Sequence, residues 1–199
     1  MEKFNLLYID DRPDPSLEKY LDREYHNLHY DIEYFETTFN PNEGYECLIQ
    51  DPKVQSANII FIDSRLFENR TVGNSKFSGE EFKIILRKYY PFIEVIVITQ
   101  NKADSDVGTI SKYDPKCGKT ASEYYAEYLP PYIEKAIQNI LIYRRLAEKL
   151  ENNKNWEATL KEKIINSLQG IGTYDELTKT DIDQLILAFK DVQEKFDVK

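Results

Sequence analysis

The chain has 199 residues, of which 41% are hydrophobic and 13% aromatic, enough to form the core of one domain of ordinary size with a further extension. Its formal net charge of −9 argues against the broad basic surface that binds nucleic-acid phosphates. No stretch approaches the ~20 apolar residues of a membrane span, and the N-terminus shows no charged and then apolar leader, so we expect a cytoplasmic protein that binds neither membranes nor nucleic acid.

Three short apolar runs have the length and composition of strands: residues 4–9, 58–62 and 93–99. Each run is nearly continuous rather than alternating, which is typical of strands covered on both faces of a parallel sheet. Weaker strands are expected at 31–37 and 108–113, and amphipathic helical patterns cover 15–26 and 78–90. Because parallel strands need helical crossovers, this alternation predicts an α/β fold with a doubly wound, five-stranded parallel sheet of the flavodoxin-like type.

The last part of the chain has a helical pattern. Residues 131–150 predict one long amphipathic helix, 156–168 predict a second, and a last helix begins at Thr180. We therefore expect an α/β domain at 1–147 and a helical extension at 148–199, which is predicted to mediate dimerisation or to bind a partner.

Polar side chains follow three of the apolar runs. Asp10 and Asp11 come directly after the first run, Asp63 comes after the second, and Thr99 ends the third. In open α/β sheets, ligands bind at the carboxyl ends of the strands, where these side chains should gather. Carboxylates that converge there repel one another unless a cation lies among them. The sequence therefore predicts a site for a divalent, oxygen-binding metal such as Mg²⁺.

The motifs that contain these aspartates resemble the receiver domain of two-component response regulators. LLYIDD, at 6–11, is similar to the first strand of the family and its acidic metal-binding pair, Asp10 and Asp11. NIIFIDSRL, at 58–66, is similar to the third strand. The resemblance implies that Asp63 is the phosphoacceptor and that Arg65 offers its backbone carbonyl to the metal.

Two further residues match the family by position. The resemblance makes Thr99 the hydroxyl residue that binds the phosphoryl group, and Lys112, in TISKY, the best match for the family's fifth-strand lysine. Lys102, Lys116 and Lys119 lie nearby and leave the choice of lysine open. The implied phosphodonor is a sensor histidine kinase or a phosphotransfer protein, and the implied output is a protein contact. No enzymatic activity is expected beyond self-phosphorylation and autodephosphorylation at the phosphoacceptor.

Several features depart from the family pattern. The segment between Asp63 and Gly79 is fifteen residues long, where receivers have a shorter loop. Gln100 replaces a small residue, Thr109 stands at the position of an aromatic switch residue, and the stretch from Thr99 to the lysine leaves room for only a truncated fourth helix. A pseudo-receiver that binds partners without phosphorylation is therefore the alternative. A phosphatase is disfavoured because no aspartate follows two residues after the nucleophile.

Two other patterns point to ordinary structure. YDPKCGKT, at 113–120, resembles the end of a phosphate-binding P-loop, but Tyr113 replaces the first glycine, so we expect a plain loop. His26 and His29 lie three residues apart without a carboxylate or cysteine pattern, and are expected to be surface or partly buried histidines rather than metal ligands.

Overall fold

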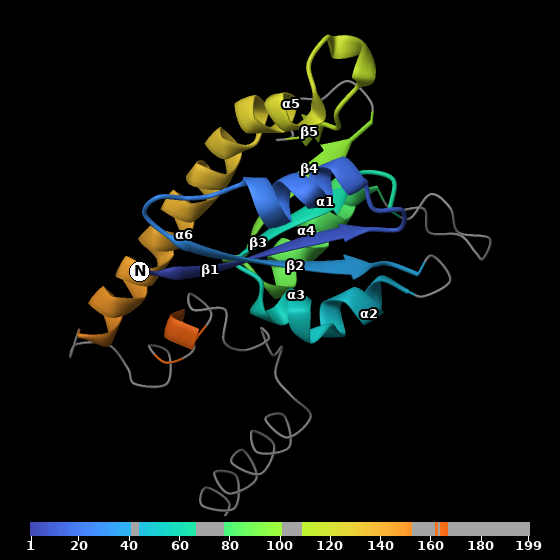
Figure 1. Ribbon diagram of the computed structural model, residues 1–199. Helices are drawn as coiled ribbons and strands as arrows, with labels where there is room; N and C mark the ends of the chain where they lie inside the picture. The colour runs from blue at the N-terminus through green and yellow to red at the C-terminus, as the bar shows by residue number, and fades with distance from the viewer. Residues whose placement is uncertain (41–43, 67–77, 101–108, 153–161, 163, 167–199) are drawn as a thin grey trace, which may run out of the picture.

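A five-stranded sheet with every strand parallel forms the centre of the molecule, in the order β2-β1-β3-β4-β5 (Figure 1). The computed structural model describes residues 1–40, 44–66, 78–100, 109–152, 162 and 164–166. The predicted doubly wound, flavodoxin-like α/β fold is confirmed, and each of the five expected strands is present. The strands are β1 (Lys3–Asp10), β2 (Asp31–Thr38), β3 (Ile59–Asp63), β4 (Glu94–Thr99) and β5 (Thr109–Ser111).

Helices cover both faces of the sheet. They are α1 (Pro15–Lys19), the π-helical turn η1 (Tyr20–Glu24), α2 (Tyr45–Gln50), α3 (Pro52–Ser56), α4 (Gly79–Tyr89), the 3-10 turn η2 (Pro115–Cys117), α5 (Ala121–Tyr128) and α6 (Pro130–Glu151). Apolar residues of α1, η1, α5 and α6 share one core cluster, and those of α2, α3 and α4 share the other. The two layers are visible on opposite sides of the strands in Figure 1.

The central strands contribute to both cores because successive side chains of a strand point to opposite faces. In β1, Leu6 and Tyr8 belong to the cluster under α1, α5 and α6, whereas Leu7 and Ile9 belong to the cluster under α2, α3 and α4. β3 and β4 divide in the same way. Burial on both faces explains why these three runs are nearly continuously apolar.

Three helical segments differ from the expectation. The helix predicted at 15–26 is α1 followed by a wider turn, in which the Tyr25 amide donates to the Tyr20 carbonyl at 2.7 Å. The short helices α2 and α3 were not predicted, because neither is long enough to show a helical period. Asp51 ends α2 and caps α3 by accepting a hydrogen bond from the Lys53 amide, which makes the break between them a local capping effect.

The predicted long helix is confirmed as α6, which begins at a proline and crosses the expected domain boundary at 147 and 148 without a break. Beyond it, Ile165 is buried against Ala147 with Phe92 and Tyr143 nearby, so this part of the extension packs on its own chain. Most of the helix predicted at 156–168, and the helix predicted from Thr180, lie outside the described residues. In the described part of the chain, no helix is both long and apolar enough to span a membrane.

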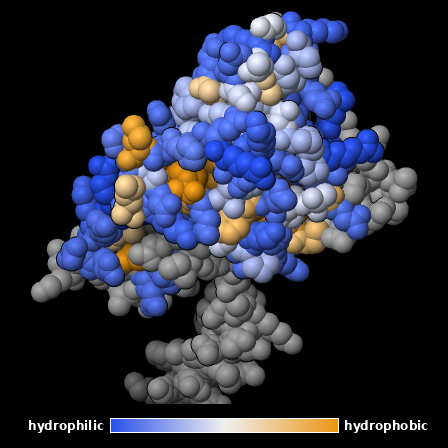
Figure 2. Space-filling view, in the orientation of Figure 1, coloured by the Kyte–Doolittle hydropathy of each residue, from blue (hydrophilic) through white to orange (hydrophobic). Residues whose placement is uncertain are grey.

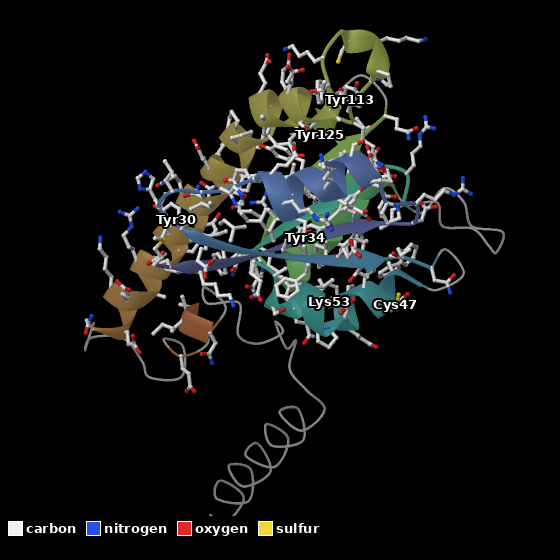
Figure 3. All side chains as sticks on the ribbon, in the orientation of Figure 1. Tyr30, Tyr34, Cys47, Lys53, Tyr113 and Tyr125 are labelled. Atoms are coloured by element: carbon white, nitrogen blue, oxygen red, sulfur yellow. The ribbon has the colours of Figure 1, made fainter. Side chains whose placement is uncertain are left out.

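The face of the molecule in Figure 2 is mostly hydrophilic, with small and separate apolar patches. Tyr113 and Tyr125 lie together near β5 and α5, whereas Cys47 lies in the other helical layer (Figure 3). Neither cysteine forms a disulfide bond, and Cys117 is exposed.

Candidate functional site

A polar pocket of about 210 Å³ lies at the carboxyl ends of the central strands. From β1 the chain passes to β2, which lies on one side of β1, and then to β3, which lies on the other side of β1. The strand order therefore reverses between β1 and β3. This switch point is where doubly wound folds bind ligands. The pocket is lined by Asp10, Asp11, Arg12, Asp63, Arg65, Gln100 and Lys112.

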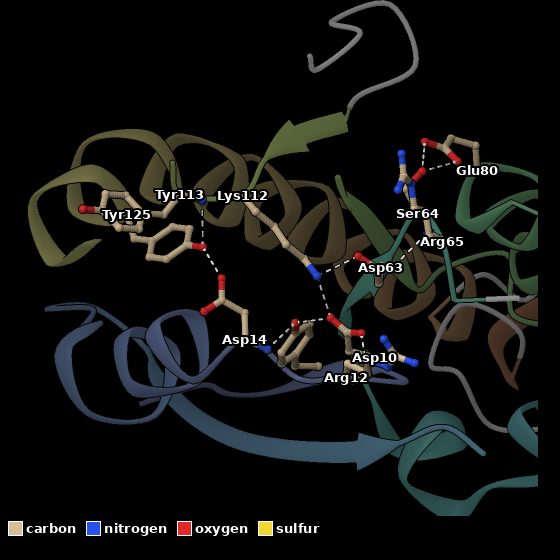
Figure 4. A network of polar contacts seen from close by, with 11 residues as sticks. Asp10, Arg12, Asp14, Asp63, Ser64, Arg65, Glu80, Lys112, Tyr113 and Tyr125 are labelled. Carbon is tan, nitrogen blue, oxygen red and sulfur yellow. Dashed lines mark hydrogen bonds and ion pairs between the residues drawn. The ribbon is translucent and has the colours of Figure 1, made fainter. Parts of the chain in front are cut away.

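A buried lysine in the wall of this pocket lies between two of its aspartates (Figure 4). Lys112 Nζ is 2.7 Å from Asp10 Oδ2 and 2.7 Å from Asp63 Oδ1. All three side chains are at most 8% exposed. Lys112 reaches this place because β5 pairs with β4 and the ladder continues for one residue, so that the Lys112 amide donates to the Thr99 carbonyl at 2.7 Å.

The two buried aspartates are held by the same local structure. The Arg12 amide donates to Asp10 Oδ1 at 2.9 Å, and the Arg65 amide donates to Asp63 Oδ2 at 2.8 Å. In each case a carboxylate at a strand end accepts the amide two residues later, which is the geometry of an Asx turn. These turns fix both carboxylates at the mouth of the pocket.

Three carboxylates are close enough to share one cation. Oxygen atoms of Asp10, Asp11 and Asp63 lie within 4.8 Å of one another. An all-oxygen donor set beside an open pocket fits Mg²⁺, which binds through one or two carboxylates and keeps waters for the rest of its shell. The residues present therefore fit the predicted metal, and Arg65 lies in the pocket wall, where the resemblance places a carbonyl ligand.

Burial and the neighbouring charges together set the ionisation of the site. It raises the pKa of Asp63 above the ordinary value, and Asp10 adds to this effect, although Lys112 and the Arg65 amide oppose it. Burial alone would lower the pKa of Lys112, but the hydrogen bonds and charges of Asp10 and Asp63 outweigh it, so this pKa is raised. Lys112 is therefore an ammonium at neutral pH that is shared by two carboxylates.

The raised pKa of Asp63 predicts how the stability of an Asp63→Asn protein depends on pH. Because the pKa of Asp63 is higher in the folded than in the unfolded state, its ionisation opposes folding once the pH rises above the unfolded value. In buffer with a metal chelator, Asp63→Asn should be more stable than wild type at pH 7.5, with a smaller difference at pH 4.5. Urea unfolding at both pH values measures this. A variant less stable than wild type at pH 7.5 contradicts the prediction.

The other predicted residues lie at the edge of the site. Thr99 is buried at the end of β4, where it pairs with Ser111, and it is not among the residues that line the pocket. Gln100 does line the pocket, as expected for a larger side chain at that position. Most of the long loop after Asp63, at 67–77, and the segment of the predicted truncated helix, at 101–108, lie outside the described residues.

One member of the site was missed from the sequence. The Tyr8 hydroxyl donates to Asp10 Oδ2 at 2.5 Å, and the side chain is 1% exposed. Burial, with the charge of Asp10, raises the pKa of Tyr8, so its hydroxyl stays protonated and acts as a donor. Tyr8 stands in an apolar run, where a tyrosine is normally a core residue. Its spacing of two from Asp10, which places both side chains on one face, was the available signal.

Residues 113–120, which resemble the end of a phosphate-binding P-loop in the sequence, form an ordinary loop between β5 and α5. Residues Pro115–Cys117 form η2, Gly118 takes a left-handed conformation, and Thr120 caps α5. The Tyr113 hydroxyl donates to the Lys119 carbonyl at 2.8 Å, which closes the loop on itself. His26 and His29 are both exposed, as predicted.

No protein-family model matches the sequence, and no curated protein matches it. Among solved structures, the chain is similar to a two component transcriptional regulator AraC from Clostridium phytofermentans ISDg, with 15% sequence identity and a TM-score of 0.40 over 72% of this chain and 98% of that one. The sheet order and the acidic pocket define the class: a flavodoxin-like α/β protein with a candidate metal centre at its switch point.

Proposed function

We propose that this protein is a phosphoacceptor receiver of a two-component or phosphorelay system. Asp63 accepts a phosphoryl group from a histidine kinase or phosphotransfer protein, with Mg²⁺, and the output is a contact with a downstream protein. The observation that supports this proposal is the bridge from Lys112 to both Asp10 and Asp63, at 2.7 Å each, inside an acidic pocket at the switch point. No catalysis is proposed beyond self-phosphorylation and autodephosphorylation at Asp63.

The proposed chemistry assigns one task to each side chain. An oxygen of Asp63 attacks the phosphorus of a phosphohistidine, the P–O bond forms as the P–N bond breaks, and the leaving imidazole nitrogen takes a proton from solvent. Asp10 and Asp11, with the Arg65 carbonyl, are the proposed metal ligands. Mg²⁺, when bound, offsets the charge on the phosphoryl oxygens. Lys112 donates to a phosphoryl oxygen. Thr99 is the proposed hydroxyl donor to the phosphoryl group, because its carbonyl accepts from the Lys112 amide and the two residues therefore lie side by side.

The test is labelling by a small phosphodonor. Wild type incubated with acetyl phosphate and Mg²⁺ should gain the mass of one phosphoryl group, and neither chelator-treated wild type nor Asp63→Asn should gain it. Asp22→Asn, which changes an exposed aspartate, is the matched control and should be labelled like wild type. Absence of labelling in wild type, or equal labelling of Asp63→Asn, refutes the proposal.

A pseudo-receiver is the second candidate. It is favoured by Gln100, a larger side chain than receivers carry at this position, which lines the pocket. In this case wild type and Asp63→Asn share the same oligomeric state by light scattering, whether monomer or homodimer, and acetyl phosphate changes neither. A shift in oligomeric state that follows labelling, and is lost in Asp63→Asn, favours the phosphoacceptor.

A further inference from the structure

The hydrogen bonds of Asp10 continue beyond the pocket. Asp10 Oδ2 accepts from Lys112 Nζ at 2.7 Å and from the Tyr8 hydroxyl at 2.5 Å. The Tyr8 oxygen in turn accepts from the Asp14 amide at 3.3 Å. Tyr8 therefore joins the metal-binding carboxylate to the loop that leads into α1.

The other side of Asp14 leads back to the lysine (Figure 4). Asp14 Oδ2 accepts from the Tyr125 hydroxyl at 3.1 Å, and the Tyr125 oxygen accepts from the Tyr113 amide at 3.1 Å. Tyr113 is the residue after Lys112, so the peptide chain closes the circuit. Four hydrogen bonds and the peptide link from Tyr113 to Lys112 thus connect Asp10 to Lys112 by a second route.

The direction of this circuit is fixed. A tyrosine hydroxyl has one proton to donate, and an amide can only donate. An ionised carboxylate can only accept, so Tyr8 and Tyr125, which each accept from an amide, give their own protons to Asp10 and Asp14. Both tyrosines are buried, at 1% and 0% exposed, so water does not compete for these bonds. The circuit has one arrangement, and in it Asp10 is always the acceptor.

We propose that Tyr8, supported by Asp14 and Tyr125, is a positioning residue for Asp10 in the metal site, an inference that rests on the Mg²⁺ site of the proposed function. The two donors on Oδ2 fix the rotation of the Asp10 carboxylate. Oδ1 then accepts the Arg12 amide and keeps acceptor capacity for a cation. Residues that orient a metal ligand in this way strengthen metal binding without touching the metal.

The experiment compares two tyrosine variants by calorimetric titration of the full-length protein with Mg²⁺. Tyr8→Phe should raise the Kd for Mg²⁺ about tenfold, the usual effect of losing an outer partner of a metal ligand. Tyr90→Phe is the matched control. Its buried hydroxyl donates to the Ile49 carbonyl at 2.6 Å in the other core, so it loses a comparable bond and should bind Mg²⁺ like wild type.

The outcomes separate positioning from a structural role. If the Tyr8 bond serves stability alone, Tyr8→Phe and Tyr90→Phe lose stability together and both keep wild-type Mg²⁺ affinity, which overturns the proposal. A wild-type protein that binds no Mg²⁺ overturns it as well. If Tyr8→Phe does not fold, Tyr125→Phe replaces it, since it breaks the same circuit farther from the metal and should weaken Mg²⁺ binding to a smaller extent.

The titration needs no phosphodonor, so its result is independent of labelling. A protein that binds Mg²⁺ through a Tyr8-dependent site but is never labelled refutes the phosphoacceptor function and supports the positioning role. If wild type is labelled, and wild type and Tyr8→Phe bind Mg²⁺ with equal affinity, the phosphoacceptor function is supported and the positioning role is refuted.

Discussion

Replacing Lys112 with methionine should lower the free energy of unfolding by about 3–5 kcal/mol at neutral pH. The ammonium is shared by Asp10 and Asp63, which are both buried, and its removal leaves two like charges facing each other without a counter-ion. Breaking a buried ion pair costs far more than the pair contributes, because the remaining charge has lost its water and its partner. Urea unfolding in the presence of a metal chelator measures the loss.

Lys119→Met is the control for this result. Lys119 forms an ion pair with Glu127, but these side chains are 36% and 51% exposed, so solvent screens the interaction and the variant should be nearly as stable as wild type. Mg²⁺ should restore part of the stability of Lys112→Met, because a cation that binds the folded state takes the place of the ammonium. Similar losses in the two variants would show that the bridge is not a major source of stability.

Replacing Gly79 with alanine should cost about 2–3 kcal/mol and should also reduce labelling at Asp63. A Cβ at this position would lie 2.4 Å from the Asp63 carbonyl oxygen and 2.9 Å from Ser64 Cα. Both are backbone atoms, and the Gly79 amide already donates to the Ser64 carbonyl at 2.8 Å. The first turn of α4 is therefore packed directly on the end of β3, and relief of the clash must move the strand end that carries Asp63.

The matched control is Gly118→Ala. Gly118 has a φ of 77°, which costs an alanine about 1 kcal/mol, but an added Cβ meets no atom within 4 Å. This variant should lose less stability than Gly79→Ala and should keep full labelling. Urea unfolding and mass measurement after acetyl phosphate treatment distinguish the two. A larger loss of stability for Gly118→Ala would mean that backbone strain, rather than contact with β3, sets the cost of replacing these glycines.

The sequence predicted the sheet because burial on both faces makes a strand apolar at every position. β1, β3 and β4 follow this rule, and the aspartates at the ends of β1 and β3 then follow from the rule that parallel strands end at one edge. The short helices α2 and α3 were missed because five or six residues show no helical period.

By itself, the sequence determined the fold class and the gathering of Asp10, Asp11 and Asp63, since both follow from local patterns repeated along the chain. Four lysines, at 102, 112, 116 and 119, were candidates for the acidic site, and the structure places Lys112 there. Only the tertiary structure decided this contact and the circuit through Tyr8, Asp14 and Tyr125. Lys112 lies 102 residues from Asp10, and Tyr125 lies 111 residues from Asp14. Such bonds depend on strand order and ladder register, which place distant strand ends within hydrogen-bonding distance and leave no trace in local spacing.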